Sequence, residues 1–420
     1  MANGDRLAGA PSPPPMPPPM PPSLSRPPNR PPSENHLAIS VPLLSLAGSG
    51  ADADVPLARW LRRLEAFLAV SGLSASTPLG VAFAASALAV VGVALPAVAV
   101  SLSPCRKHER VCDDFEVEMF EVCVMMSQAA AAAVAVACVS RKMSMYGLRK
   151  FLFVDPELGM RIRFQKEYVV RIQDFFRTLM WWILPCLAVK VTREMFRFSH
   201  MFHQSIWRSC IVLFASIMSW VYLTTIVLSS CMLFNLVCNL QVIHFDDYGK
   251  VLEQDADPLV YLKEHLQLRH NLSKISHRFR MFLLLLFFSV TASQFAILYK
   301  TTAYNGPINF TNGGDIAVSS VVQVVGLVLC LHGAAKISHR AQNIAAIASR
   351  WHALATCSSD STYVLYLLTN PGGITLYGWI VDRTFLNTIL MLELTLVLFV
   401  LSKTVVIPAK TLVNSYMSFP

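Results

Sequence analysis

The chain has 420 residues, of which 54% are hydrophobic and only 15% are charged. A soluble protein carries about 25% charged residues, so this composition argues against two or three soluble domains and indicates a membrane protein. The formal charge of +9 does not indicate a nucleic-acid partner, because the basic residues concentrate beside apolar segments, where they set topology and meet anionic lipid.

Residues 1–54 are predicted to be a disordered cytoplasmic tail. Proline dominates part of this segment, as in residues 11–20, and such a composition cannot bury a core. An SH3-like or WW-like partner of the proline stretch is the alternative. From Val55 to Leu73, apolar residues at helical spacing and clustered arginines predict a short amphipathic helix at the inner membrane surface.

Apolar segments along the rest of the chain are suited to cross ~30 Å of hydrocarbon as helices. Seven are predicted, at residues 79–100, 120–140, 177–191, 210–240, 281–299, 316–335 and 385–401. The third is short and contains Pro185, so a buried or interfacial helix is its alternative. The predicted fold class is therefore all-α, a polytopic membrane protein with a seven-helix membrane domain over residues 55–410 and a short outer tail over 411–420.

Lysine and arginine predict the orientation, because loops rich in them stay in the cytoplasm. They concentrate in the N-terminal tail and in alternate loops, so we expect a cytoplasmic N-terminus and an extracellular C-terminus, in the plasma membrane. Four basic residues assigned to the second outer loop are exceptions: Lys190, Arg193, Arg197 and Arg208. The outer loops also hold a glycosylation sequon at Asn309 and a candidate disulfide pair, Cys105 and Cys112; the other cysteines lie mostly inside spans, as small apolar residues.

Two further stripes predict that helices continue below the membrane. Apolar residues and a histidine recur at alternating steps of four and three, at Tyr261, His265, Leu268, Leu272, Ile275 and Phe279. Ile344, Ile347, Trp351 and Leu354 repeat the pattern. We expect such cytoplasmic helix extensions to pack their stripes together, within one subunit or between subunits.

The search for catalytic chemistry is negative. The chain has no phosphate-binding loop with its lysine, no Cys-x-x-Cys, no His-Glu-x-x-His and no nucleophile elbow. We therefore expect neither enzyme activity nor a cofactor. His200 and His203 lack a third ligand nearby, so no metal site is expected either.

The last apolar segment carries the clearest pattern. At ~100° per residue, one narrow sector of that helix contains Thr388, Leu392, Thr395, Phe399 and Ser402. Around a central axis, these hydroxyls would solvate an ion and Phe399 would exclude water; helix packing through small polar residues is the alternative. Glu393 lies on a different face and either pairs with a neighbouring helix or takes part in ligand sensing. Interhelical hydrogen bonds are the expected role of Gln294 and Gln323.

Longer motifs carry a family resemblance. They are residues 146–155, 163–168, 242–249, 272–280 and 378–383, and they resemble the plant domain-of-unknown-function family 3537 over about residues 55–410. That family is similar to the insect gustatory and odorant receptors, which have seven helices and an inside N-terminus. The resemblance implies a homotetrameric, ligand-gated cation channel whose seventh helix lines the pore.

In the register of the insect signature, Phe399 falls at an apolar gate and Ser402 at a polar ring. The tyrosine and glutamine of that signature are replaced by Leu396 and Ser402. We expect an unknown small molecule to enter from the outer half of the bundle, with Trp181, Trp182 or Tyr299 as aromatic walls; a role as simple core or interface anchors is their alternative. A non-conducting seven-helix receptor and a transporter-like or structural membrane protein remain the other function classes.

Overall fold

The computed structural model describes residues 50–74, 77–101, 113–152, 162–200, 206–252, 258–303, 310–354, 369, 372–396 and 398. The predicted residues Cys105, Cys112, Asn309, Phe399 and Ser402 lie outside these ranges, as do residues 1–49 of the N-terminal tail and all of 411–420. The predictions made for them therefore stay predictions.

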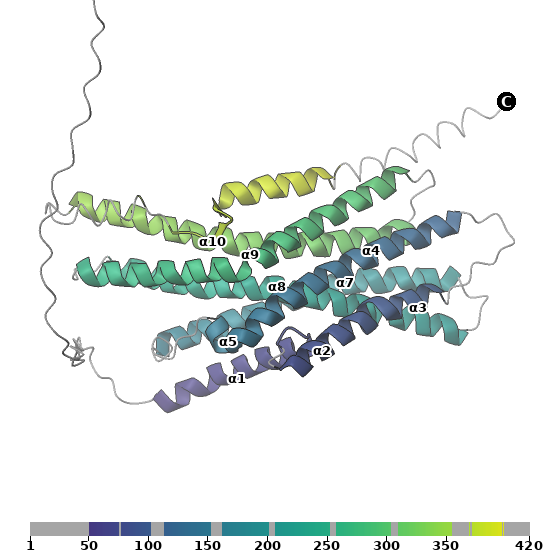
Figure 1. The fold of residues 1–420 in the computed structure, drawn as a ribbon, viewed down its shortest axis with the longest axis horizontal. Coiled ribbons are helices and arrows are strands. Elements are labelled where there is room, and N and C mark those ends of the chain that lie inside the picture. The colour runs from purple at the N-terminus through teal and green to yellow at the C-terminus, as the bar shows by residue number, and fades with distance from the viewer. Residues whose placement is uncertain are drawn as a thin grey trace, which may run out of the picture. The chain divides into compact units, whose positions relative to one another are not determined.

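The described chain is almost entirely helical (Figure 1). α1 (Gly50–Val70) is followed by an interrupted helix made of α2 (Pro78–Ala87), the π-helical segment η1 (Leu88–Ala94) and α3 (Leu95–Ser101). A second interrupted helix consists of α4 (Asp113–Ala135), the π-helical segment η2 (Val136–Ser140) and α5 (Arg141–Phe151). Long helices follow: α7 (Ile162–His200), α8 (Ile206–Leu252), α9 (Pro258–Ala303) and α10 (Phe310–Leu354). A hairpin of β1 (Thr375–Leu376) and β2 (Trp379–Ile380) precedes a last helix over residues 383–396.

Within the described residues, six helical stretches are long and apolar enough to cross a membrane. They are Leu79–Val98, Val124–Phe151, Phe164–Phe196, Cys210–Lys250, Lys263–Tyr299 and Ala317–Ile344. Each contains or overlaps one of the first six predicted spans, so those helices are confirmed, including the short third one. The seventh segment, 385–401, is described only in part, and its crossing stays a prediction.

The helices α7 to α10 are longer than a bilayer requires. α7 has 39 residues and α8 has 47, so at ~1.5 Å per residue they measure roughly 58 and 70 Å, about twice the hydrocarbon thickness. The predicted stripe on α9 is buried from His265 to Phe279, within a single chain. The helix extensions thus exist, and neighbouring helices of the same subunit cover this stripe.

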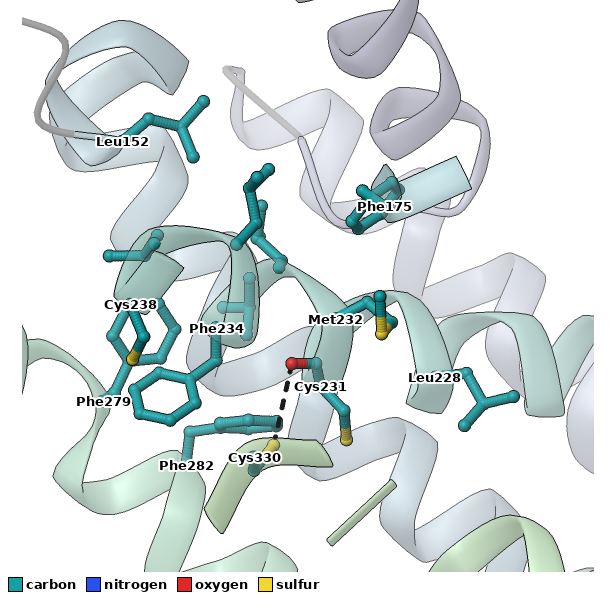
Figure 2. Packing of buried hydrophobic residues seen from close by; sticks show 14 of the residues in the cluster. Leu152, Phe175, Leu228, Cys231, Met232, Phe234, Cys238, Phe279, Phe282 and Cys330 are labelled. Carbon is teal, nitrogen blue, oxygen red and sulfur yellow. Dashed lines mark hydrogen bonds between the residues drawn. The ribbon is translucent and has the colours of Figure 1, made fainter. Parts of the chain in front are cut away.

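α8 contributes much of the core (Figure 2). Its Phe234 ring lies 4.8 Å from the ring of Phe279 on α9, centroid to centroid. Cys231 and Cys330 are fully buried, and the Cys330 thiol approaches the Cys231 carbonyl oxygen at 3.8 Å. Cys231, Cys238 and Cys330 are free thiols, and these buried residues pack as small apolar side chains, as predicted.

α8 and α10 approach closely at positions where α10 has glycine. A Cβ atom on Gly333 would lie 2.6 Å from Oδ1 and 3.2 Å from Cα of Asn235, which leaves no room for a side chain. One on Gly326 would lie 3.2 Å from the Cys231 sulfur. Small residues therefore allow these two backbones to pack tightly, as is common between membrane helices.

α1 is amphipathic as predicted, but its apolar face has a different environment. Leu64 and Leu68 are fully buried. The ring of Phe67 makes an edge contact with Phe176 of α7 at 5.5 Å, and Trp60 lies 6.3 Å from the same ring. The apolar face of α1 therefore packs against α7 rather than facing lipid, which corrects the interpretation from sequence.

Candidate functional site

The β-hairpin attaches the last helix to the bundle. Its two-residue turn, Tyr377 and Gly378, has positive φ angles of 50° and 95°, a conformation that favours glycine. The backbone N–H of Thr375 donates to the hydroxyl of Ser276 on α9 at 2.8 Å, and that of Ile374 donates to Ser338 of α10 at 3.1 Å. Two buried serines therefore fix the start of the last helix on α9 and α10.

One stripe of the last helix faces the bundle. Asp382 caps its first turn, because Oδ1 accepts from the Phe385 N–H at 2.8 Å. Phe385, Leu386 and Ile389 pack against the hydrophobic core. Glu393 follows one turn after Ile389 on this side and is only 2% exposed. The helix thus rests on its neighbours through a narrow attachment stripe.

The predicted pore-lining face is not covered by the described chain. Thr388, Leu392 and Thr395 are exposed, with Leu392 at 45%. Each threonine hydroxyl donates to the carbonyl four residues earlier in its own helix, at 3.0 Å for Thr388 and 2.6 Å for Thr395. Each hydroxyl oxygen keeps lone pairs that can accept a hydrogen bond or coordinate a cation.

Glu393 is a buried carboxylate at the centre of the attachment. Neither of its carboxylate oxygens has a hydrogen-bond partner among the described residues. Burying an ionised carboxylate without a partner is costly, so this side chain is expected to be neutral or to acquire a partner in a further assembly. The pairing predicted as one option from sequence is not formed within the described part of the chain.

The structure does not bring the three predicted aromatic wall residues together. Trp181 is 73% exposed and Tyr299 is 72% exposed, whereas Trp182 is half-buried and packs against the core. Of the three residues, only Trp182 is positioned to line a pocket inside the bundle. The aromatic wall stays a prediction.

A layer of buried polar groups joins α4, α9 and α10. The amide of Gln323 on α10 donates to the hydroxyl of Ser127 on α4 at 3.2 Å, which confirms the interhelical role predicted for Gln323. Val124 and Ile297 form a buried contact between α4 and α9, which run antiparallel. One turn later in α4 and one turn earlier in α9, Gln128 is therefore level with residue 293.

Gln128 was not predicted as a site residue, although a polar residue inside an apolar run is a signal for a functional or interhelical role. Neither side-chain polar atom of Gln128 has a hydrogen-bond partner among the described residues, and the same holds for the Ser293 hydroxyl and the Gln294 amide nitrogen. Unsatisfied polar groups inside a membrane domain are costly. These groups would need a partner beyond the described residues, such as water or another molecule, to satisfy their hydrogen bonds.

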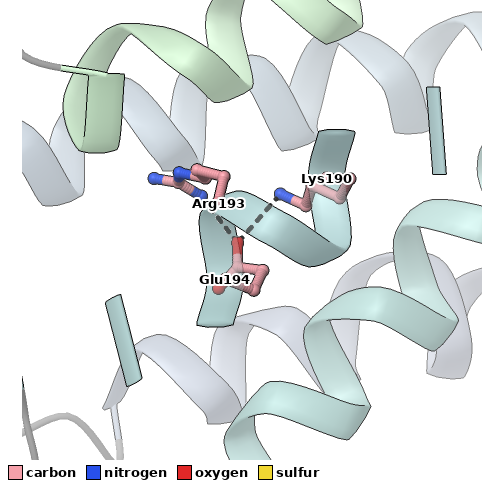
Figure 3. A network of polar contacts seen from close by, with 3 residues as sticks. All are labelled: Lys190, Arg193 and Glu194. Atoms are coloured by element: carbon pink, nitrogen blue, oxygen red, sulfur yellow. Dashed lines mark hydrogen bonds and ion pairs between the residues drawn. The ribbon is translucent and has the colours of Figure 1, made fainter. Parts of the chain in front are cut away.

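A buried ionic cluster lies in the C-terminal part of α7, and Figure 3 shows its three side chains. One carboxylate oxygen of Glu194 lies 2.6 Å from Arg193 Nη1 and 3.2 Å from Lys190 Nζ. All three side chains are at most 4% exposed. Lys190 and Arg193 were assigned to an outer loop from sequence, and that assignment is wrong, because α7 continues to His200 and buries them. Both are buried helix residues rather than loop residues, and Glu194 pairs with each of them.

The long sequence motifs meet in space. The hydroxyl of Tyr168, in motif 163–168, lies 2.7 Å from Nε2 of His244, in motif 242–249. The guanidinium of Arg278, in motif 272–280, stacks over the ring of Tyr146 at 4.0 Å and donates to the Lys150 carbonyl at 3.1 Å. These contacts tie α5 to α9 and α7 to α8.

The remaining motif joins the same network. The guanidinium of Arg280 lies over the ring of Tyr377 at 5.6 Å, beside the hairpin turn at Gly378. Gly147, in the first motif, has φ 71° and ψ 156°, which breaks the helix there and re-aims the chain toward α9. The unusual motifs thus specify how the helix extensions are held together and how the last helix is attached.

These helices and contacts define an integral, multi-pass helical membrane protein with a receptor-like fold. Two solved structures of an insect olfactory receptor, OR5 from Machilis hrabei, share this fold. The receptor in complex with eugenol matches with a TM-score of 0.59 and 13% identity, over 83% of this chain and 99% of the receptor. The receptor alone matches with a TM-score of 0.54 and 12% identity, over 83% and 98% of the two chains.

The sequence itself identifies the family. The model of a family described as "Protein of unknown function (DUF3537)" matches residues 59–363 and 360–392, so the chain belongs to that family. No curated protein matches the chain. At 12–13% identity the insect receptors show the fold alone.

Proposed function

We propose that this protein is a ligand-gated cation channel in which the last helices of four identical subunits line a central pore. The observation that carries the proposal is the attachment of the last helix by one stripe. That attachment leaves Thr388, Leu392 and Thr395 uncovered on another face. A helix with an uncovered row of hydroxyls and leucine suits a water-filled axis shared by several copies.

The proposed topology has seven crossings, a cytoplasmic N-terminus and an extracellular C-terminus. Segment 385–401 would complete the seventh crossing, and at ~100° per residue Phe399 and Ser402 continue the face of Thr395. In this arrangement Phe399 forms the gate and Ser402 the polar ring. Glycosylation at Asn309 and retention of the N-terminal tail in the cytoplasm test the orientation; a tail modified on an inserted sequon would contradict it.

The proposed ligand is a small molecule that enters the outer half of the bundle from outside the plasma membrane. Support comes from the fold likeness to a receptor solved with eugenol and from the half-buried position of Trp182. Trp181 and Tyr299 would then contact lipid or a neighbouring subunit.

Imaging of the purified protein in nanodiscs tests the assembly first, and we expect a tetramer. Voltage-clamped bilayers then test conduction, with Phe399→Ala expected to leak current without ligand. Leu394→Ala is the matched control, because Leu394 is 52% exposed on another face of the same helix and should leave the closed state intact. A monomer, or a tetramer whose Phe399→Ala variant stays silent, would overturn the pore and favour a non-conducting receptor or a transporter-like protein.

A further inference from the structure

A pocket of about 460 Å³ lies between the first turns of α7 and the last turns of α8. Its charged lining consists of Lys166, Glu167, Arg171, Asp246, Asp247 and Lys250. Ligand pockets commonly enclose ~300–1,000 Å³, so this one has room for a small polar molecule. None of its residues belongs to the last helix or to the proposed pore face.

The two helices are tied together beside this pocket. The hydroxyl of Tyr168 on α7 lies 2.7 Å from Nε2 of His244 on α8. The ring of Phe164, which also lines the pocket, lies 5.6 Å from the His244 ring. The walls of the pocket are therefore fixed by contacts that do not require a ligand.

The pocket begins at the level of the lipid headgroups and extends beyond them. Counted from the predicted spans 177–191 and 210–240, the helix rise is about 5 Å to Ile243 and 9 Å to Arg171, but about 15 Å to Lys250 and 17 Å to Lys166. Headgroup layers extend roughly 5–8 Å beyond the hydrocarbon on each side. In the proposed orientation this is the cytoplasmic side, where anionic lipids attract basic residues.

Positive charge dominates around the pocket. α10 adds Arg340, whose Nη1 lies 3.4 Å from Oδ1 of Asp246, and Lys336, which lies within electrostatic range of Arg171, Arg340 and Asp246. With these two residues, five cationic side chains meet three carboxylates. The surplus of positive charge favours an anion, and Asp246 is already paired with Arg340.

The mixture of charges narrows the chemical class further. Arginine and lysine bind phosphate oxygens strongly, whereas carboxylates such as Glu167 accept hydrogen bonds from hydroxyl groups. A simple phosphate ion would not use these carboxylates. We propose that this pocket binds a phosphorylated polyol, presented either as a lipid headgroup or as a soluble phosphate ester. The proposal rests on the proposed orientation, and it does not require that the protein conduct ions.

Native mass spectrometry of the purified full-length protein tests the site directly. Phosphatidylinositol 4-phosphate, phosphatidylserine and soluble inositol trisphosphate are added separately, and we expect the phosphoinositide to be retained in preference to phosphatidylserine. The double variant Lys166→Gln with Arg171→Gln should weaken this binding by about tenfold or more, because each lost charge removes charge-assisted hydrogen bonds. Equal binding by the variant and the native chain, or equal retention of phosphatidylserine, would overturn the site.

Arg177→Gln is the matched control on the same helix. Its side chain is 82% exposed and pairs at 2.8 Å with Asp174 outside the pocket, so phosphoinositide binding should be unchanged. Unchanged thermal unfolding of the double variant in detergent establishes that it folds. Loss of binding in Arg177→Gln as well would show that general surface charge, not the pocket, holds the lipid.

Two comparisons identify the chemistry and the source. Inorganic phosphate should compete poorly with inositol trisphosphate for the native chain, and Glu167→Gln should reduce the difference in affinity between the two compounds. Equal competition in the native chain would overturn the proposal that the pocket recognises the hydroxyl groups of a polyol. Retention of the lipid without the soluble ester identifies a headgroup held at the bilayer, whereas binding of the soluble ester identifies a cytoplasmic phosphate ester. Binding of neither compound would refute the proposal while leaving the channel proposal intact, since conduction is measured separately.

Discussion

Truncation of Phe279 to alanine is expected to be among the most destabilising single changes in the helix extensions. Phe279 is 2% exposed, and its ring lies 5.3 Å from Phe151, 4.8 Å from Phe234 and 6.4 Å from Phe282, centroid to centroid. Each aromatic pair contributes ~0.5–1.5 kcal/mol beyond burial, and truncation of a buried phenylalanine costs about 3–5 kcal/mol in total. Because the three partners come from α5, α8 and α9, the cavity would loosen several helices at once.

Thermal unfolding of the purified protein in one detergent measures this effect. A loss of 3–5 kcal/mol corresponds to a fall of roughly 3–6 °C in the midpoint for a protein of this size. Phe288→Ala is the matched control, because Phe288 is on the same helix but 69% exposed, and its midpoint should stay within about 2 °C of the native value. Equal midpoints for the two variants would refute the conclusion that the four rings form a packed core.

Other contacts give equally direct expectations. Ser276→Ala removes the hydroxyl that accepts from the Thr375 N–H, at a cost of about 1–3 kcal/mol, so hydrogen exchange in residues 372–382 should accelerate. Unchanged exchange would show that this hydrogen bond does not hold the hairpin on α9. Glu194→Gln removes the carboxylate that pairs with Lys190 and Arg193, and it should lower the free energy of unfolding by about 3–5 kcal/mol in thermal unfolding. Loss of an exposed ion pair costs at most about 1 kcal/mol, so an effect that small would show that the cluster is solvated. Glu393→Gln should unfold at or above the native midpoint, because a neutral amide is cheaper to bury than a carboxylate without a partner, and a clear fall would reveal a partner from another subunit.

Much of the fold could be predicted because its signals are local. Apolar length predicted the first six spans, and steps of three and four predicted the buried side of α9 from His265 to Phe279. The angular pattern of the last helix separated the face of Thr388 from that of Glu393, and the structure exposes the first and buries the second. Where the spacing of residues along a single helix decides the outcome, sequence is sufficient.

The site was less predictable, because burial there depends on distant helices. Trp181 and Tyr299 look like pocket walls in the sequence, yet no described helix covers them. Gln128 was not predicted as a site residue, yet its side chain is buried and has no hydrogen-bond partner among the described residues. Hydropathy assigns such residues an average environment, and it contains no information about which neighbour a given face meets.

The sequence by itself determined that this is a multi-pass helical membrane protein of a defined family, since apolar length, helical periodicity and the long motifs are properties of contiguous residues. Only the tertiary structure decided that α1 covers α7, that Lys190 and Arg193 are buried partners of Glu194, and that one stripe attaches the last helix. The physical reason is that these outcomes depend on close packing between segments far apart in the chain. Spacing along one helix does not encode that choice of partner.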